Sequence, residues 1–136
     1  MNQALDLFKI FSDESRLRVL NILEKKELAV CQIMGILGMS QPLVSRNLFL
    51  LQRAGFIEYR REGKLMYYRF KSELSKKQGL LFDVFRIVAG EEPVFKKDMD
   101  SLKDCERFQK KVGKCNMETL KAFMEYRKQK QGKNKK

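Results

Sequence analysis

Cysteines are the residues of this chain with the most evident chemistry, because its 136 residues contain three of them and no histidine. Cys115 lies among lysines and directly before a predicted helix, and both features favour a reactive thiolate. Cys31 and Cys105 stand in apolar surroundings, where cysteine also serves as a small packing residue. An odd number of cysteines without a secretory signal predicts reduced thiols in a cytoplasmic protein.

A second group of residues suits contact with a polyanion. In the segment 38–70, Ser40 is a predicted N-cap and Gly55 ends the helix that follows. Apolar residues at i, i+4 and i+7 form the inner stripe of this helix, and its outer face is polar and basic. Residues 56–61 and 65–70 predict a β-hairpin with a glycine in its turn. We expect a winged helix-turn-helix whose helix enters the major groove and whose hairpin lies near phosphates.

The net charge of +12 is concentrated in two segments. Residues 40–70 contain six Lys and Arg against two acidic residues, and residues 96–136 contain fourteen against six. Basic excess on a helix–hairpin unit is expected of a domain that binds nucleic acid. The last ten residues, 127–136, contain no acid and are predicted to be a basic disordered tail.

The remaining elements of the first 90 residues would position this unit. Amphipathic helices are expected at residues 2–11 and after Asp13. A short helix at 31–37 is joined by a tight turn to the helix that follows Ser40, which we call the reading helix. Residues 80–88 are apolar almost all round, which predicts a helix buried on two sides, with a second subunit on one of them. The predicted interface residues are Leu5, Phe8, Leu81, Val84, Phe85 and Val88.

Two further helices are predicted beyond residue 90, the first from Pro93 to Gly113. Cys105 lies on its apolar seam, roughly 10 Å along the helix from its end, so pairing with Cys115 would require the chain to fold back at Gly113. The predicted organisation is a DNA-binding and dimerisation domain, a helical extension carrying these two cysteines, and the tail. Their boundaries are 1–90, 91–126 and 127–136.

Four segments together resemble the ArsR/SmtB family of winged-helix repressors, in matching order and spacing. They are LFKIFSDESRLRVLNIL, ELAVCQIM, MSQPLVSRNLFLLQRAGFI and REGKLMYYRF, and they span about residues 4–90. The resemblance implies a homodimer held by the first and fifth helices, bound to a palindromic operator and released by a metal ion, metalloid or thiol-reactive signal. The expected fold class is therefore mainly α with a small β-hairpin wing, homodimeric, with extra C-terminal helices.

The resemblance also assigns DNA-contacting positions. The reading helix and its cap supply five of them, and the hairpin supplies three that would meet phosphates. Asn47 stands where the family often has histidine, and Leu43 where many members have a polar residue, so the base preference is not predicted. The predicted DNA-contacting residues are Ser40, Gln41, Ser45, Arg46, Asn47, Arg60, Arg61 and Lys64.

The resemblance to this family also limits which inducers are expected. Zinc-type sites on the family's fifth helix use histidine with carboxylates, so zinc is not expected in a chain without histidine. The arsenic-responsive branch carries Cys-Val-Cys at the start of the third helix, where this chain has Ala29-Val30-Cys31 and keeps only the second thiol. One sulfur does not hold a trivalent metalloid tightly, so further thiols would have to join it. The candidate metalloid or redox thiols are Cys31, Cys105 and Cys115.

The leading prediction is a dimeric, sequence-specific repressor of transcription that is released from operator DNA by trivalent arsenic or antimony. It requires no cofactor and has no membrane partner. One alternative keeps the repressor and makes the signal thiol oxidation or persulfide formation between two cysteines. Another is a nucleoid-type protein that binds DNA of any sequence without an inducer. An enzyme is not expected, because no acid–base or nucleophile constellation is visible.

Overall fold

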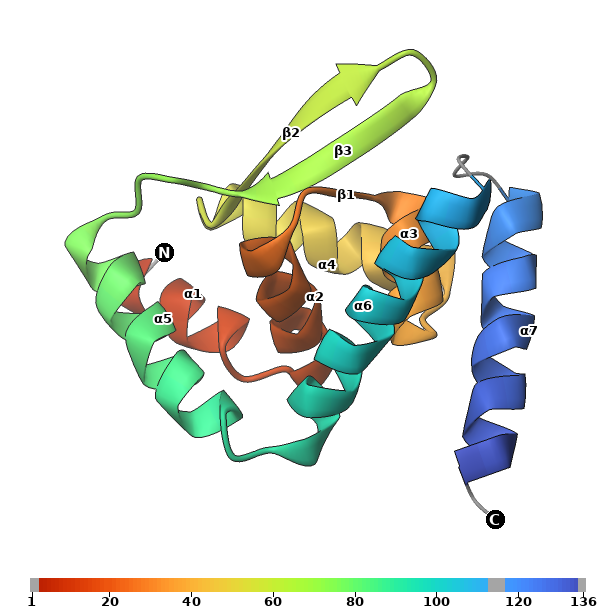
Figure 1. The fold of residues 1–136 in the computed structure, drawn as a ribbon. Coiled ribbons are helices and arrows are strands. Elements are labelled where there is room, and N and C mark those ends of the chain that lie inside the picture. The colour runs from red at the N-terminus through yellow and green to blue at the C-terminus, as the bar shows by residue number, and fades with distance from the viewer. Residues whose placement is uncertain (1–2, 113–116, 135–136) are drawn as a thin grey trace.

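The computed structural model describes residues 3–112 and 117–134. Within them it contains seven helices and one three-stranded sheet (Figure 1). In chain order the elements are α1 (Gln3–Ile10), α2 (Glu14–Lys25), β1 (Leu28–Ala29), α3 (Val30–Leu37), α4 (Gln41–Arg53), β2 (Ile57–Glu62), β3 (Leu65–Phe70), α5 (Lys76–Ala89), α6 (Pro93–Val112) and α7 (Met117–Asn134).

Local capping chemistry explains where the helices of the N-terminal half begin and end. The Asp13 side chain accepts a hydrogen bond from the Arg16 backbone N–H at 3.1 Å and starts α2. Ser40 accepts from the Leu43 N–H and starts α4. Gly38 adopts a left-handed conformation with φ of 67° at the end of α3, which permits the tight turn into α4. The predicted helix-turn-helix is therefore confirmed.

The wing is a hairpin of β2 and β3, joined by a two-residue turn between Glu62 and Leu65. Gly63 has a φ of 61°, which only glycine adopts without strain at the first central position of such a turn. The short strand β1, directly before α3, pairs with β3 at Leu28 and Tyr68. The sheet order is β1-β3-β2. This pairing ties the start of α3 to the base of the wing.

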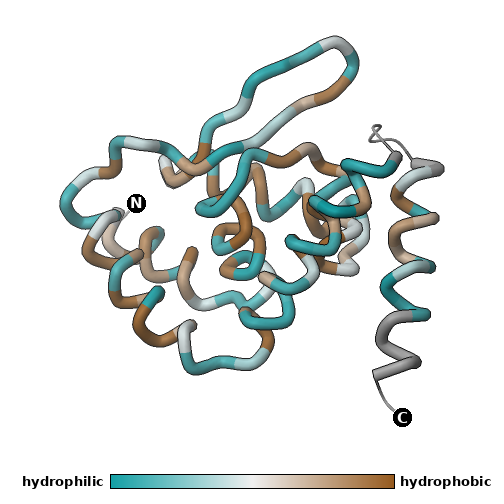
Figure 2. The backbone as a smooth tube through the Cα atoms, viewed as in Figure 1, coloured by the Kyte–Doolittle hydropathy of each residue, from teal (hydrophilic) through white to brown (hydrophobic). Residues whose placement is uncertain are grey.

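One hydrophobic core connects the helix-turn-helix with the C-terminal extension. Leu20, Leu48 and Phe56 are almost completely buried at its centre. Phe85 of α5 packs edge-on against Phe95 of α6 at 5.3 Å between ring centroids, and the extension residues of α6 and α7 belong to the same cluster. The extension therefore packs directly on the first 90 residues. Figure 2 shows, in addition, hydrophobic segments along α5 at the edge of the molecule.

The last helix is longer than the sequence suggested. α7 continues to Asn134 and so covers most of the segment 127–136, where a disordered tail was predicted. A contact across the extension accounts for part of the difference, because Arg127 donates to the buried Asp104 carboxylate of α6. In the parts of the chain that the structure describes, no helix combines the length and the apolar character needed to cross a membrane.

Candidate DNA interface and thiol site

The outer face of α4 carries the side chains predicted to enter the groove. Gln41, Ser45 and Arg46 are exposed, whereas Val44 and Leu48 point into the core and are almost completely buried. Ser40 is exposed as well, and its hydroxyl is used as the N-cap of the helix. The arrangement leaves a polar, positively charged helix surface available to a base edge or a phosphate.

Asn47 does not belong to that surface. Its side chain is 2% exposed, and its amide donates a hydrogen bond to the Ser15 hydroxyl at 3.1 Å. The Ser15 hydroxyl in turn donates to the Asp13 carboxylate at 2.6 Å. Asn47 therefore joins the start of α2 to α4, and its placement among the DNA-contacting residues is corrected. Its spacing from Val44 and Leu51 already puts it on the inner stripe of the helix.

The three basic residues predicted to meet phosphate differ in their surroundings. Arg61 and Lys64 are exposed near the tip of the wing. Arg60 instead donates to Glu27 at 2.7 Å, pairs with Glu62 at 2.9 Å and lies over the Tyr67 ring at 4.8 Å. The bond from Arg60 also lowers the pKa of the Glu27 carboxyl. Arg60 thus holds the wing against the end of α2 in this structure.

The neighbouring helices α1 and α5 both carry exposed apolar side chains, which together we call the apolar face. Phe11, directly after α1, packs on Phe85 at 6.2 Å between ring centroids, so the two helices are neighbours. Of the predicted interface residues, Phe85 is buried in the core of the subunit and Leu81 is half-buried. Leu80 and Ile87 are exposed as well and were not among the predicted interface residues. The exposed members of the apolar face are Leu5, Phe8, Leu80, Val84, Ile87 and Val88.

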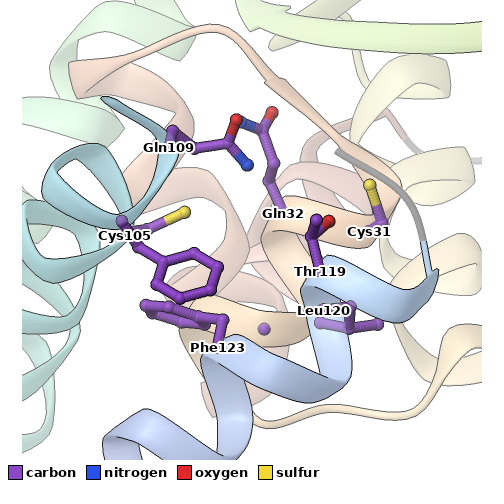
Figure 3. Close-up of a pocket in the computed structure, with 9 residues that line it drawn as sticks. Cys31, Gln32, Cys105, Gln109, Thr119, Leu120 and Phe123 are labelled. Atoms are coloured by element: carbon purple, nitrogen blue, oxygen red, sulfur yellow. The ribbon is translucent and has the colours of Figure 1, made fainter. Parts of the chain in front are cut away.

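The two cysteines that the structure describes line one small cavity of about 10 Å³ between α3, α6 and α7 (Figure 3). Cys31 lies in the first turn of α3 and is disulfide-bonded. Cys105 is a free thiol on α6, and its burial raises its pKa to about 11. Such a thiol is almost entirely protonated at neutral pH and reacts slowly. Cys115, the third cysteine of the sequence, lies outside the described residues.

Metal-binding side chains are not gathered elsewhere in the described ranges 3–112 and 117–134. No group of three or more His, Cys, Asp or Glu residues there is close enough to hold an ion. Cys105 and Cys31 share their cavity mainly with glutamine and apolar side chains, among them Gln32, Gln109 and Phe123. A site for a soft ion would therefore depend on thiols.

Three buried polar residues of α6, none of them among the predicted site residues, attach the extension to the helix-turn-helix and to α7. Asp98 accepts two bonds of 2.9 Å from the Arg18 guanidinium of α2. Ser101 donates to the Ile36 carbonyl at the end of α3, at 2.6 Å. Asp104 binds Arg127 of α7. The three residues are spaced three positions apart along one helix, between apolar neighbours. Such spacing puts them on the same side of the helix and could have predicted a buried polar stripe.

Gly35 makes the close approach of α7 to α3 possible. A Cβ atom at this position would lie 2.7 Å from Leu120 Cδ1 and 3.1 Å from Phe123 Cδ1 of α7. Since α6 and α7 both pack on α3, the cavity that contains Cys31 and Cys105 adjoins the first helix of the helix-turn-helix. A change at this cavity would therefore act on α3, which is joined to α4 by the tight turn at Gly38.

Comparison with known proteins agrees with this architecture. Residues 13–59 match the model of the bacterial regulatory protein family named arsR. The winged helix-turn-helix DNA-binding domain of a possible ArsR-family transcriptional regulator from Mycobacterium bovis, described as homodimeric, shares 34% identity at a TM-score of 0.54. The match covers 65% of this chain and 80% of that domain. The chain belongs to the ArsR family. Its family is therefore one of transcriptional regulators, not of enzymes.

Two curated relatives are similar over the N-terminal part of this ArsR-family chain. The arsenic resistance transcriptional regulator ArsR2 of Pseudomonas putida is 46% identical over 70 residues, which is 51% of this chain. The arsenical resistance operon repressor of Escherichia coli is 41% identical over 71 residues, which is 52% of this chain. The matched segment spans 61% of the length of each relative. The two C-terminal helices lie outside the family model, which ends at residue 59.

Proposed function

We propose that this ArsR-family protein is a homodimeric repressor that acts in the cytoplasm and binds operator DNA sequence-specifically. The observation that carries the proposal is the exposed polar face of α4, with Gln41, Ser45 and Arg46 presented beside a basic wing. The relative named as an operon repressor in Escherichia coli supports the same role. In this arrangement α4 lies in the major groove, and Arg61 and Lys64 of the wing meet the backbone.

We propose that a second copy of the chain packs on the apolar face and forms a homodimer. Phe8 is 61% exposed and Ile87 is 74% exposed, and exposed apolar residues grouped on one surface mark interaction sites. A dimer with two-fold symmetry buries the same face on both subunits and presents two α4 helices to two half-sites. The homodimeric description of the Mycobacterium bovis domain supports this arrangement.

Arg46→Ala tests the reading role of α4. We expect operator affinity to fall by about 2 kcal/mol, roughly 30-fold, for each half-site, because a two-bonded contact from arginine to guanine contributes ~1–3 kcal/mol of discrimination. Fluorescence anisotropy on operator and scrambled duplexes at one salt concentration measures the loss. Binding to the scrambled duplex should change much less. Equal losses on the two duplexes would show that Arg46 contacts only phosphate.

We further propose that the inducer acts on the thiol that Cys31 carries once its disulfide is reduced, with trivalent arsenic or antimony as the leading candidate. The relatives named for arsenic resistance support this choice. Cys105 is a poor partner, because burial raises its pKa to about 11. The second thiol of the proposed site is therefore Cys115, whose lysine neighbours in the sequence favour the thiolate.

Oxidation is the second candidate signal, and the disulfide-bonded state of Cys31 favours it. In this version the thiols of Cys31 and Cys115 lose two electrons and two protons to hydrogen peroxide, which is reduced to two molecules of water, and an S–S bond forms. The reduced protein binds the operator and the oxidised protein releases it. Reductant restores the two thiols and with them the DNA-bound state.

Titration of the reduced protein on a duplex from upstream of its own coding region separates the two signals. We expect arsenite to release the wild-type protein and zinc to have no effect; release by peroxide alone would favour the oxidative version. Cys31→Ser should abolish the response, whereas Cys105→Ala should preserve it and serves as the matched control. A Cys31→Ser protein that responds like wild type would contradict both versions of the proposal.

A further inference from the structure

The direction of α6 follows from its contacts with α3. Asp98 and Ser101, near the start of α6, lie at the end of α3, where Ser101 donates to the Ile36 carbonyl and Arg18 joins Asp98 to the Leu37 carbonyl. Gln109, near the end of α6, lines the same cavity as Gln32 in the first turn of α3. α6 therefore runs antiparallel to α3, and its C-terminal end reaches the start of α3.

The start of α3 is a position close to DNA in a helix-turn-helix complex, because the first helix of the motif crosses the phosphate backbone. In this chain α3 begins directly after β1, which pairs with β3 of the wing at Ala29 and Tyr67. Figure 1 shows the upper end of α6 on the side of the molecule to which the wing projects. The C-terminal end of α6 thus lies beside the start of α3, on the side of the molecule to which the wing projects.

This end of α6 carries positive charge that the described residues do not neutralise. Lys110 and Lys111 are exposed, and neither forms an ion pair with another residue that the structure describes. The acidic residues on the inner side of α6 already form ion pairs with other residues, since Asp98 binds Arg18 and Asp104 binds Arg127. Two adjacent lysines at this location suit contact with phosphate, which needs charge but no base-specific geometry.

We propose that Lys110 and Lys111 contact DNA phosphates next to the groove occupied by α4, so that the C-terminal extension enlarges the DNA interface. The inference rests on the proposed DNA-binding function and adds a surface from outside the region that matches the family. Because phosphate contacts do not distinguish bases, these lysines contribute to affinity and to its salt dependence, and specificity remains with α4.

The test compares two double variants of the full-length protein. Lys110→Ala with Lys111→Ala removes the proposed contacts, and Lys96→Ala with Lys97→Ala removes an equally exposed lysine pair roughly 20 Å away at the other end of α6. Operator and scrambled duplexes are titrated by anisotropy over a range of salt concentrations. Thermal unfolding monitored by circular dichroism shows that both variants are folded.

We expect the slope of log Kobs against log salt concentration to decrease in magnitude by about 3.6 in the Lys110/Lys111 variant, because the homodimer carries this lysine pair twice and each neutralised phosphate contributes ~0.9 to that slope. Its affinity should fall in the same proportion on both duplexes, and the Lys96/Lys97 variant should match wild type. Identical slopes for wild type and both variants would overturn the inference while leaving the DNA-binding function intact. Wild-type protein that binds neither duplex would overturn the proposed function itself.

Discussion

Replacement of Ile87 by glutamate is expected to convert the protein to monomers and to reduce operator affinity by about 100-fold or more. Ile87 is the most exposed large apolar residue of the apolar face, at 74%. In a two-fold dimer each subunit would bury one of the introduced carboxylates in apolar surroundings, which costs several kcal/mol per unpaired charge. A monomer presents only one α4 and so loses the gain that comes from binding two half-sites together.

Sedimentation equilibrium of wild type and Ile87→Glu measures the first effect, and anisotropy on the operator duplex measures the second. Met124→Glu is the matched control, because it introduces the same charge at an exposed apolar residue of α7, outside the apolar face. The control should remain dimeric. An Ile87→Glu protein that stays dimeric would place the subunit interface elsewhere.

Replacement of Asp98 by alanine is expected to lower the free energy of unfolding by about 3 kcal/mol. Asp98 is 3% exposed and binds Arg18 through two hydrogen bonds of 2.9 Å. Burial raises the pKa of the Asp98 carboxyl, and the Arg18 guanidinium opposes that rise. Without the carboxylate, a largely buried arginine loses its partner, and breaking such pairs costs ~3–5 kcal/mol. We expect a loss at the lower end of this energy range, because the Arg18 side chain is 22% exposed and water can partly solvate its charge.

Urea denaturation monitored by circular dichroism measures this loss. Asp100→Ala provides the control, since Asp100 lies two residues away on the exposed side of the same helix and should change stability by less than about 0.5 kcal/mol. Equal and small losses in the two variants would show that the Arg18–Asp98 pair does not hold α6 on the helix-turn-helix. The result also bears on regulation, because α6 contacts the end of α3 directly.

The packing of the extension provides a physical route between the proposed thiol site and the DNA interface. Cys31 begins α3, and Gly35 in the same helix allows α7 to approach closely. An inducer that changes how α7 packs on α3 changes the helix that positions α4. Coupling between two sites requires a free energy of ~1–3 kcal/mol, which is within the range of a modest repacking of apolar side chains.

The sequence alone determined the elements whose patterns are local. The apolar spacing of Val44, Leu48 and Leu51 placed the exposed face of α4, and Ser40 and Gly63 fixed a helix start and a hairpin turn. These features depend on residues a few positions apart, and the structure confirms them. The same spacing contained the information that Asn47 points inward, which the resemblance to histidine-bearing relatives obscured.

Only the tertiary structure decided which partners distant side chains find. Residues 80–88 are apolar almost all round, so no periodicity could reveal that Phe85 enters the core while Ile87 remains exposed; packing on Phe11 and Phe95 decides it. Arg60 binds Glu27, 33 residues away, and Arg18 binds Asp98, 80 residues away. Such pairs leave no local signal in the sequence, because their geometry exists only after the helices and strands have packed together.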